Sequence, residues 1–143
     1  EDGKSTLQHF TKDNSPLPTN SVRSLAYEPQ SGKLYLGPPT GLVAFQGSAY
    51  SPSDNLKEIE VYPNPIRPGY KSLLTIRGLQ AKCVVKITDI TGNAVFETTS
   101  TGGSLQWDLR SFTGERVRSG VYLIFITTSD GLDSAVEKVM IIN

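Results

Sequence analysis

Two prolines that flank one asparagine, in the run Pro63-Asn64-Pro65, constrain this chain more than any other local feature. A proline has no backbone N–H and a fixed φ, so the run cannot lie inside a helix or a central strand. It directly follows Val61 and Tyr62, which are typical strand residues, and a Ser/Pro-rich stretch comes shortly before it. The run therefore predicts the kinked end of a first strand, at the start of a new domain.

The chain as a whole predicts an all-β protein. Short runs of β-branched and aromatic residues are broken by Gly, Pro, Asn, Asp and Ser, and no long helical pattern is visible. The second half predicts seven short strands, about ten residues apart, which is typical of an antiparallel immunoglobulin-like sandwich. They are Lys57–Tyr62, Leu73–Arg77, Lys82–Thr88, Ala94–Thr98, Ser104–Trp107, Gly120–Thr128 and Ser134–Ile142.

Within this sandwich, the run Val121–Ile126 is apolar on both faces and is therefore expected in a central strand. The dipeptide Asp130-Gly131 predicts a hairpin turn to the last strand. The expected core residues are Val85, Ile87, Trp107, Tyr122 and Ile124.

Residues 1–46 predict a separate three- or four-stranded antiparallel sheet. Its candidate strands are Thr6–Phe10, Ser21–Tyr27, Lys33–Leu36 and Gly41–Phe45. Residues 47–56 are rich in serine and poor in apolar residues, which is linker composition. We therefore expect a sheet at 1–46, a linker at 47–56 that makes few contacts, and the sandwich at 57–143.

Composition argues against most kinds of chemistry. The chain has 14 basic and 14 acidic residues, so nothing favours a nucleic acid or an anionic membrane as a partner. Its one histidine, His9, has no second ligand or catalytic partner nearby. Its one cysteine, Cys83, lies in an alternating strand pattern and is expected to be a small buried apolar side chain. The aspartates fall at predicted turns, where aspartate caps the backbone. The sequence predicts no catalytic residue, no metal site and no cofactor.

Two aromatic residues could have special roles, and for Trp107 a structural and a functional interpretation are both open. Trp107 is either a core anchor or an exposed platform on which a sugar could stack. Tyr122 opens the most apolar strand and could form a tyrosine corner, in which its hydroxyl bonds to the backbone across a loop.

The second half of the chain resembles the C-terminal sorting domain of the type IX secretion system of Bacteroidetes. The resemblance rests on an ordered set of runs: Val61–Pro65, Asp89-Ile90-Thr91-Gly92, Trp107-Asp108 and Ser119–Leu123. It implies that sorting depends on Pro63, Asn64, Pro65, Gly120, Tyr122 and Lys138. Asp133-Ser134-Ala135 also fits a short O-glycosylation pattern of these bacteria, which makes Ser134 a candidate acceptor.

This resemblance implies a non-enzymatic module that carries its parent protein through the periplasm to the cell surface or the medium. The implied partners are the type IX translocon, which recognises the folded domain, and a surface sortase. In most family members the sortase cuts before the domain, here between Gly47 and Glu58, and joins the cargo to lipopolysaccharide.

The first half of the chain is similar to one blade of a two-component-regulator β-propeller. The similar runs are Asn14–Leu25, Gly32–Gly37 and Gly41-Leu42, and the departure is Pro38-Pro39. A propeller before a sorting domain is also the order of a type IX surface component that serves the sortase by handling anionic lipopolysaccharide. A blade without neighbours leaves an apolar face and strand edges open, and that face should pack on the sandwich or on another copy of the chain. We predict self-association.

Two other functions stay open at the level of sequence. Propeller sensors of hybrid histidine kinases also carry an immunoglobulin-like domain after the last blade, so a periplasmic sensor region is the main alternative. A carbohydrate-binding or adhesion module is the third, and aromatic residues exposed on one face would be its mark.

Overall fold

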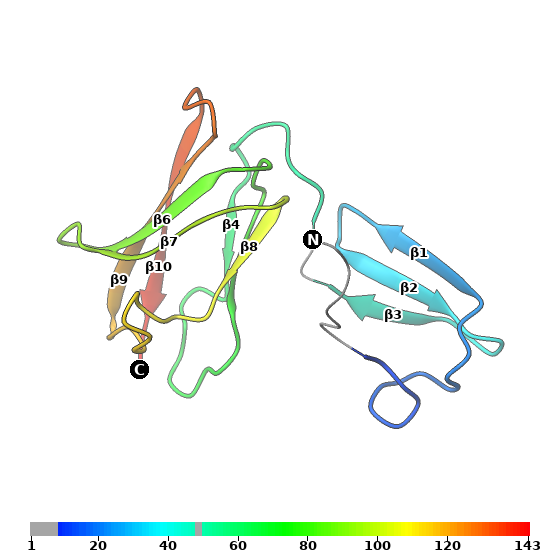
Figure 1. Cartoon of the computed structure of the whole chain (residues 1–143). Coiled ribbons are helices and arrows are strands. Elements are labelled where there is room, and N and C mark those ends of the chain that lie inside the picture. Colours follow the sequence, from blue (N-terminus) through cyan, green and yellow to red (C-terminus); the bar gives the residue numbers. More distant parts are fainter. Residues whose placement is uncertain (1–8, 48–49) are drawn as a thin grey trace. The chain divides into compact units, whose positions relative to one another are not determined.

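A computed structural model of the chain describes residues 9–47 and 50–143. These residues form ten strands and no helix, and Figure 1 labels all of the strands except β5. The chain divides into two compact units, residues 1–47 and residues 48–143. The all-β class predicted from the sequence is confirmed.

The first unit is a three-stranded antiparallel sheet of β1 (Ser24–Glu28), β2 (Lys33–Gly37) and β3 (Val43–Gln46), in the order β1-β2-β3. Gly32 adopts a φ of 68° in the turn between the first two strands, a conformation that glycine takes without strain. The ring centroids of Phe10 and Phe45 lie 4.7 Å apart. Most of the predicted strand Thr6–Phe10 lies outside the described residues, and its described part, His9 and Phe10, is not in a strand.

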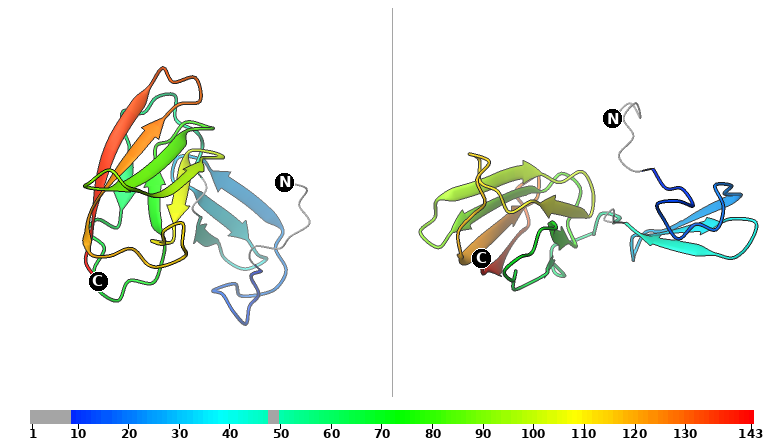
Figure 2. Two further views of the ribbon diagram at one scale, coloured as in Figure 1. Left: turned by 60° about the vertical axis from the view of Figure 1, so that its left-hand side comes forward. Right: turned by 90° about the horizontal axis from the view of Figure 1, so that it is seen from below.

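The second unit is a sandwich of two antiparallel sheets (Figures 1 and 2). One sheet has the order β10-β9-β6-β7 and the other has the order β4-β5-β8. The bounds are β4 (Glu60–Tyr62), β5 (Leu74–Arg77), β6 (Val84–Asp89), β7 (Ala94–Thr99), β8 (Ser104–Trp107), β9 (Gly120–Thr127) and β10 (Ser134–Ile141). All seven predicted strands are present, and β9 is central in its sheet, as its apolar sequence indicates. Residues 128–133 form the predicted turn to β10, with Gly131 at a φ of 72°.

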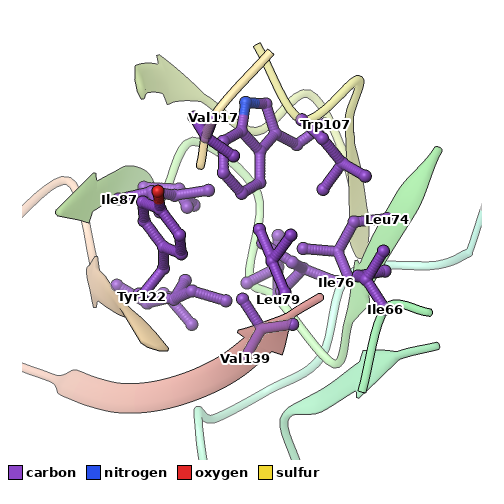
Figure 3. Close-up of a cluster of buried hydrophobic side chains, with 14 of the residues drawn as sticks. Ile66, Leu74, Ile76, Leu79, Ile87, Trp107, Val117, Tyr122 and Val139 are labelled. Atoms are coloured by element: carbon purple, nitrogen blue, oxygen red, sulfur yellow. The ribbon is translucent and has the colours of Figure 1, made fainter. Parts of the chain in front are cut away.

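The core lies between the two sheets because each strand turns alternate side chains inward. Along β9, Tyr122, Ile124 and Ile126 are buried, while the residues between them face outward. Trp107 of β8 is fully buried, and its ring centroid lies 5.9 Å from that of Phe96 and 6.1 Å from that of Tyr122. Figure 3 shows the Trp107 ring pointing into the cluster that both sheets supply. All five core residues expected from the sequence are buried.

The indole of Trp107 also satisfies its polar atom inside the domain. Its Nε1 donates a hydrogen bond of 2.8 Å to the carbonyl oxygen of Arg110. A fully buried indole offers no surface on which a sugar could stack. The interpretation of Trp107 as a sugar platform is therefore wrong.

The expectation of few contacts before residue 57 is also wrong for the segment from Tyr50 to Leu56, which we call the strap. The amide of Gly103 donates to the Tyr50 carbonyl (2.9 Å), and the amide of Ser53 donates to the Leu79 carbonyl (2.8 Å). Leu56 is 5% exposed and belongs to the core cluster. The strap passes so close to Gly103 that a Cβ at that position would lie 1.9 Å from the Ser51 oxygen. Backbone pairing and one buried leucine therefore hold a segment whose composition suggests a free linker.

We predict that Trp107→Ala lowers the free energy of unfolding of the sandwich by about 3–5 kcal/mol, the usual cost of truncating a large buried aromatic. Denaturant unfolding followed by circular dichroism measures this change, since the variant loses its tryptophan fluorescence. Phe112→Ala is the matched control, because Phe112 is 64% exposed and its truncation is expected to change stability by less than about 0.5 kcal/mol. A cost below about 1 kcal/mol for Trp107→Ala would contradict the central position of this residue.

Candidate functional site

The segment Pro63–Ile66 lies along the outer edge of β10 and closes part of it; we call this arrangement the edge clasp. Strand β4 ends at Tyr62, directly before Pro63, because a proline cannot donate to the ladder. Both X–Pro bonds of the run, Tyr62–Pro63 and Asn64–Pro65, are cis. The chain then reaches β10, an edge strand of the four-stranded sheet.

Asn64 forms the clasp by using its side-chain amide as a strand uses its backbone. Its Nδ2 donates to the carbonyl oxygen of Lys138 (2.9 Å), and its Oδ1 accepts from the amide of Met140 (3.2 Å). These are the donor and acceptor pair that a neighbouring strand would supply. The side chain thus satisfies two backbone groups on an edge that otherwise faces solvent.

Ile66 extends the clasp with its own backbone. Its amide donates to the Met140 carbonyl (2.8 Å), and its carbonyl accepts from the amide of Ile142 (2.9 Å). Ile66 forms an isolated parallel bridge with Ile141, and its side chain is fully buried in the core. Side-chain burial and two backbone bonds fix the position from which Asn64 reaches β10.

The structure brings the predicted sorting residues to one end of β10. Asn64, which lies between Pro63 and Pro65, meets this strand at Lys138, whose carbonyl accepts from the Asn64 side chain while Lys138 itself is exposed. The other two predicted residues lie on the neighbouring strand β9, where Gly120 pairs with Ile141 and Tyr122 pairs with Val139. The sequence predicted that Pro63-Asn64-Pro65 follows the first strand and that Gly120, Tyr122 and Lys138 lie in the last two strands, but it held no sign that Asn64 bonds to the last strand.

Tyr122 is a structural residue of this region. Its hydroxyl donates to the carbonyl oxygen of Arg118 (2.9 Å), which is the tyrosine corner expected from the sequence. The ring is 6% exposed, and burial raises the pKa of its hydroxyl. This bond ties the loop before β9 to the core.

A second anchor at this end of the sandwich could not be foreseen from the sequence. The side chain of Asn143 accepts from Nε of Arg116 (3.0 Å) and donates to the Val117 carbonyl (2.8 Å). The Asn143 amide donates to Oγ of Ser119 (2.9 Å), and Arg116 also donates to the Tyr70 carbonyl (3.0 Å). These partners lie 24 to 46 residues apart along the chain, so no local pattern marks them.

A cluster of two tyrosines and an arginine holds the strap against the β4-β5-β8 sheet of the sandwich. The guanidinium of Arg77 lies 5.5 Å from the ring centroids of both Tyr50 and Tyr62, and it forms an ion pair of 2.5 Å with Glu60. The hydroxyls of the two tyrosines are 3.2 Å apart. The pKa of Tyr62 is raised to about 12, chiefly by burial and secondly by the hydrogen bond with the Tyr50 hydroxyl. These contacts pack the strap against β4 and β5.

Ser134, the candidate glycosylation residue, is exposed at the first position of β10. Its backbone amide donates a hydrogen bond to Oδ1 of Asp133 (2.9 Å). The other oxygen of that carboxylate accepts from the amide of Leu56 in the strap (3.2 Å). Modification of Ser134 stays a prediction.

The described residues contain no group of three or more His, Cys, Asp or Glu that could hold a metal ion, and they form no helix long and apolar enough to cross a membrane. His9 is exposed, and Cys83 is fully buried, as predicted. Burial raises the pKa of the Cys83 thiol. Asp108 and Asp130 accept from nearby backbone amides, as expected of aspartates at turns.

Asp89 is the most heavily bonded of the turn aspartates. Its carboxylate accepts from the hydroxyl of Thr91 (2.6 Å), the side-chain amide of Asn93 (3.0 Å) and the backbone amides of both residues. These bonds favour the charged form and lower the pKa of Asp89 to about 2. They organise the turn between β6 and β7.

Comparison with known proteins gives one family match and several similar solved structures. Residues 60–142 match the family described as "Secretion system C-terminal sorting domain". The chain is 41% identical to PorZ of Porphyromonas gingivalis, an essential bacterial surface component of the type IX secretion system, with a TM-score of 0.60. The alignment covers 96% of this chain but 18% of the PorZ chain, so this chain spans less than a fifth of that protein.

A second solved structure, dimeric latent PorU of the same organism, is 20% identical over 77% of this chain and 12% of its own, with a TM-score of 0.45. No curated protein matches the chain.

We predict that Asn64→Ala opens the edge clasp without unfolding the sandwich. It removes the partners of the Lys138 carbonyl and the Met140 amide, and each lost bond is expected to cost about 0.5–1.5 kcal/mol. Hydrogen exchange should therefore speed up at the Met140 amide but much less at the Ile142 amide, which Ile66 still holds. Asn64→Asp keeps the acceptor and loses the donor, so it should protect Met140 better than alanine does. Equal protection of Met140 in the native protein and in Asn64→Ala would contradict the clasp.

We predict that the Asp89 carboxyl titrates with a midpoint of about 2, below its ordinary value of 3.8. Because the folded-state pKa is lowered, this group stabilises the fold above pH 3.8, and the contribution is lost as the pH falls towards 2. A carboxyl titration by NMR measures the midpoint. Thr91→Ala should move it upward, because the hydroxyl bond is the largest cause of the shift. An unmoved midpoint in this variant would exclude Thr91 as that cause.

Proposed function

The chain belongs to the family of secretion system C-terminal sorting domains, and from this we propose that its sandwich is a non-enzymatic signal by which a longer parent protein is exported through the type IX system. The main support for the proposal is that the residues matched by the family are the same residues that form the sandwich. The match at 60–142 spans all seven strands of the sandwich, from β4 to β10. A sorting tail of this type implies export to the cell surface or the extracellular space.

The features that support recognition of a folded domain are those that only the complete sandwich has. Asn64 and Lys138 are 74 residues apart in the chain and meet only when β10 is in place. We propose that Pro63, Asn64, Pro65, Gly120, Tyr122 and Lys138 serve sorting through this shared structure. The type IX translocon is the proposed partner, and its proposed contact is the end of the sandwich where these residues gather.

We further propose that the parent is a PorZ-like surface protein. Support comes from the 41% identity with PorZ, which extends over 96% of this chain and therefore includes much of the first unit. The three antiparallel strands of that unit are compatible with the last blade of a β-propeller. Self-association through an uncovered blade face stays a prediction, as does a role in handling lipopolysaccharide for the sortase.

Whether a sortase cuts before the sandwich depends on access to the segment from Gly47 to Glu58. The strap occupies Tyr50–Leu56 of this segment and is bonded to the sandwich at Gly103 and Leu79. We propose that the domain is retained, because a protease needs an extended and mobile substrate segment. The sensor alternative has no specific observation in its favour, and the buried Trp107 removes the main support for a carbohydrate-binding module.

The proposal predicts that residues 48–143, fused to the C-terminus of a periplasmic reporter, carry the reporter to the surface or medium of a Bacteroidetes host with an intact type IX system. The fusion begins at residue 48, because the strap belongs to the second unit. Fractionation of the reporter between periplasm, surface and medium measures the result. A fusion without residues 138–143 should stay periplasmic, because it lacks most of the clasped edge.

Asn64→Ala separates two ways in which the clasp could act. Retention in the periplasm of a folded Asn64→Ala fusion would mean that the translocon reads the clasp itself. Normal export would mean that the clasp serves the fold alone. A native fusion that is folded, stable and yet confined to the periplasm of this host would disprove the sorting function.

A further inference from the structure

The edge of β10 is closed over half of its length and open over the other half. Backbone groups along an edge strand alternate between the neighbouring strand and solvent. The amides and carbonyls of the odd-numbered residues of β10 face β9, and those of the even-numbered residues face outward, as the bonds of Met140 to the clasp demonstrate. The register with β9 is continuous from Ser134 to Ile141, so the same alternation holds throughout. The outward groups of Ser134, Val136 and Lys138 therefore form the rest of this edge.

Side chains terminate the open part at both ends. At one end, the amide of Ser134 donates to Oδ1 of Asp133 (2.9 Å). At the other end, the carbonyl of Lys138 accepts from Nδ2 of Asn64 (2.9 Å). No hydrogen bond within residues 9–47 and 50–143 uses the four outward groups between them. These are the Ser134 carbonyl, the Val136 amide and carbonyl, and the Lys138 amide. We call this stretch the open edge.

The four groups of the open edge are complementary to themselves under a two-fold axis at Val136. In an antiparallel pair of two such edges, the two Val136 residues face each other and exchange both of their backbone bonds. The Lys138 amide of each copy then faces the Ser134 carbonyl of the other. The pair makes four backbone hydrogen bonds. The next bond on either side would join the Ser134 amide to the Lys138 carbonyl of the other copy, and it is blocked because both groups already have side-chain partners. We propose that the open edge of β10 pairs with the same edge of a second copy of this chain.

The side chains around the axis suit this pairing. Val136 is 58% exposed and lies beside Phe125 of β9, its register partner, which is 38% exposed. Opposite residues across two edge strands have Cβ atoms about 4.5–5.5 Å apart, so the second Val136 would extend this apolar row. Lys138 would face Ser134, and Glu137 would face Ala135, so no like charges meet across the axis. The pairing has a two-fold axis and blocked ends, so it yields a dimer and not a fibre.

Replacement of Val136 tests this pairing in the full chain. Proline is tolerated on an edge strand where its missing N–H would face solvent, so Val136→Pro is expected to keep the fold and lose the central bonds of the dimer. Val136→Thr keeps the N–H and the β-branched shape and is the matched control. In sedimentation experiments over a concentration series, the native chain and Val136→Thr should form dimers, and Val136→Pro should show a lower average mass. A native chain that stays monomeric, or a folded Val136→Pro that associates like the native chain, would overturn the proposal.

Crosslinking keeps the proposal testable if Val136→Pro does not fold. In Val136→Cys the two new thiols lie opposite each other across the axis, so a short bis-maleimide reagent should join two chains. Ile90→Cys is the control, since Ile90 is 72% exposed in the turn between β6 and β7, away from the edge of β10. Cys83 is fully buried and should not react in either variant. Equal crosslinking of the two cysteine variants would place the contact elsewhere and refute pairing through β10.

Discussion

The sandwich depends on the removal of one set of apolar side chains from water between two small sheets. Trp107 from the three-stranded sheet reaches Phe96 and Tyr122 of the four-stranded sheet, so its ring touches both halves of the interior. Neither sheet could bury its inner face alone, because a sheet with one apolar face needs a second layer. The edges of the two sheets carry the edge clasp, the strap and the open edge.

The sheet edges of this sandwich are partly covered by segments that are not strands. The Asn64 side chain and the Ile66 backbone take the place of a strand beside β10, at a point where proline prevents a real strand from continuing. The strap similarly lies beside Gly103, where any side chain would collide with it. Both devices satisfy backbone groups that would otherwise pair with another chain. The uncovered groups around Val136 therefore stand out against an edge that is elsewhere closed.

The strands could be predicted from the sequence because the information that defines them is local. Alternation, β-branched runs and turn residues gave each strand of the sandwich to within a few residues, and the same patterns predicted the burial of Trp107 and the corner at Tyr122. The pairing of Asn64 with β10 and the anchoring of Asn143 join distant residues and leave no periodic mark. The strap was misjudged for a related reason: its serines suggest a linker, and one buried residue, Leu56, outweighs them.

The edge clasp can form only in a chain that contains both the first and the last strand of the sandwich. Its first half lies just after the first strand of the sandwich and its second half in the last strand, so a chain that stops before β10 cannot close it. Domains fold as units while the chain emerges from its N-terminal side, and this one must wait for its final strand. A secretion machinery that recognises the closed sandwich would therefore export chains in which β10 is present and leave behind chains that end before it.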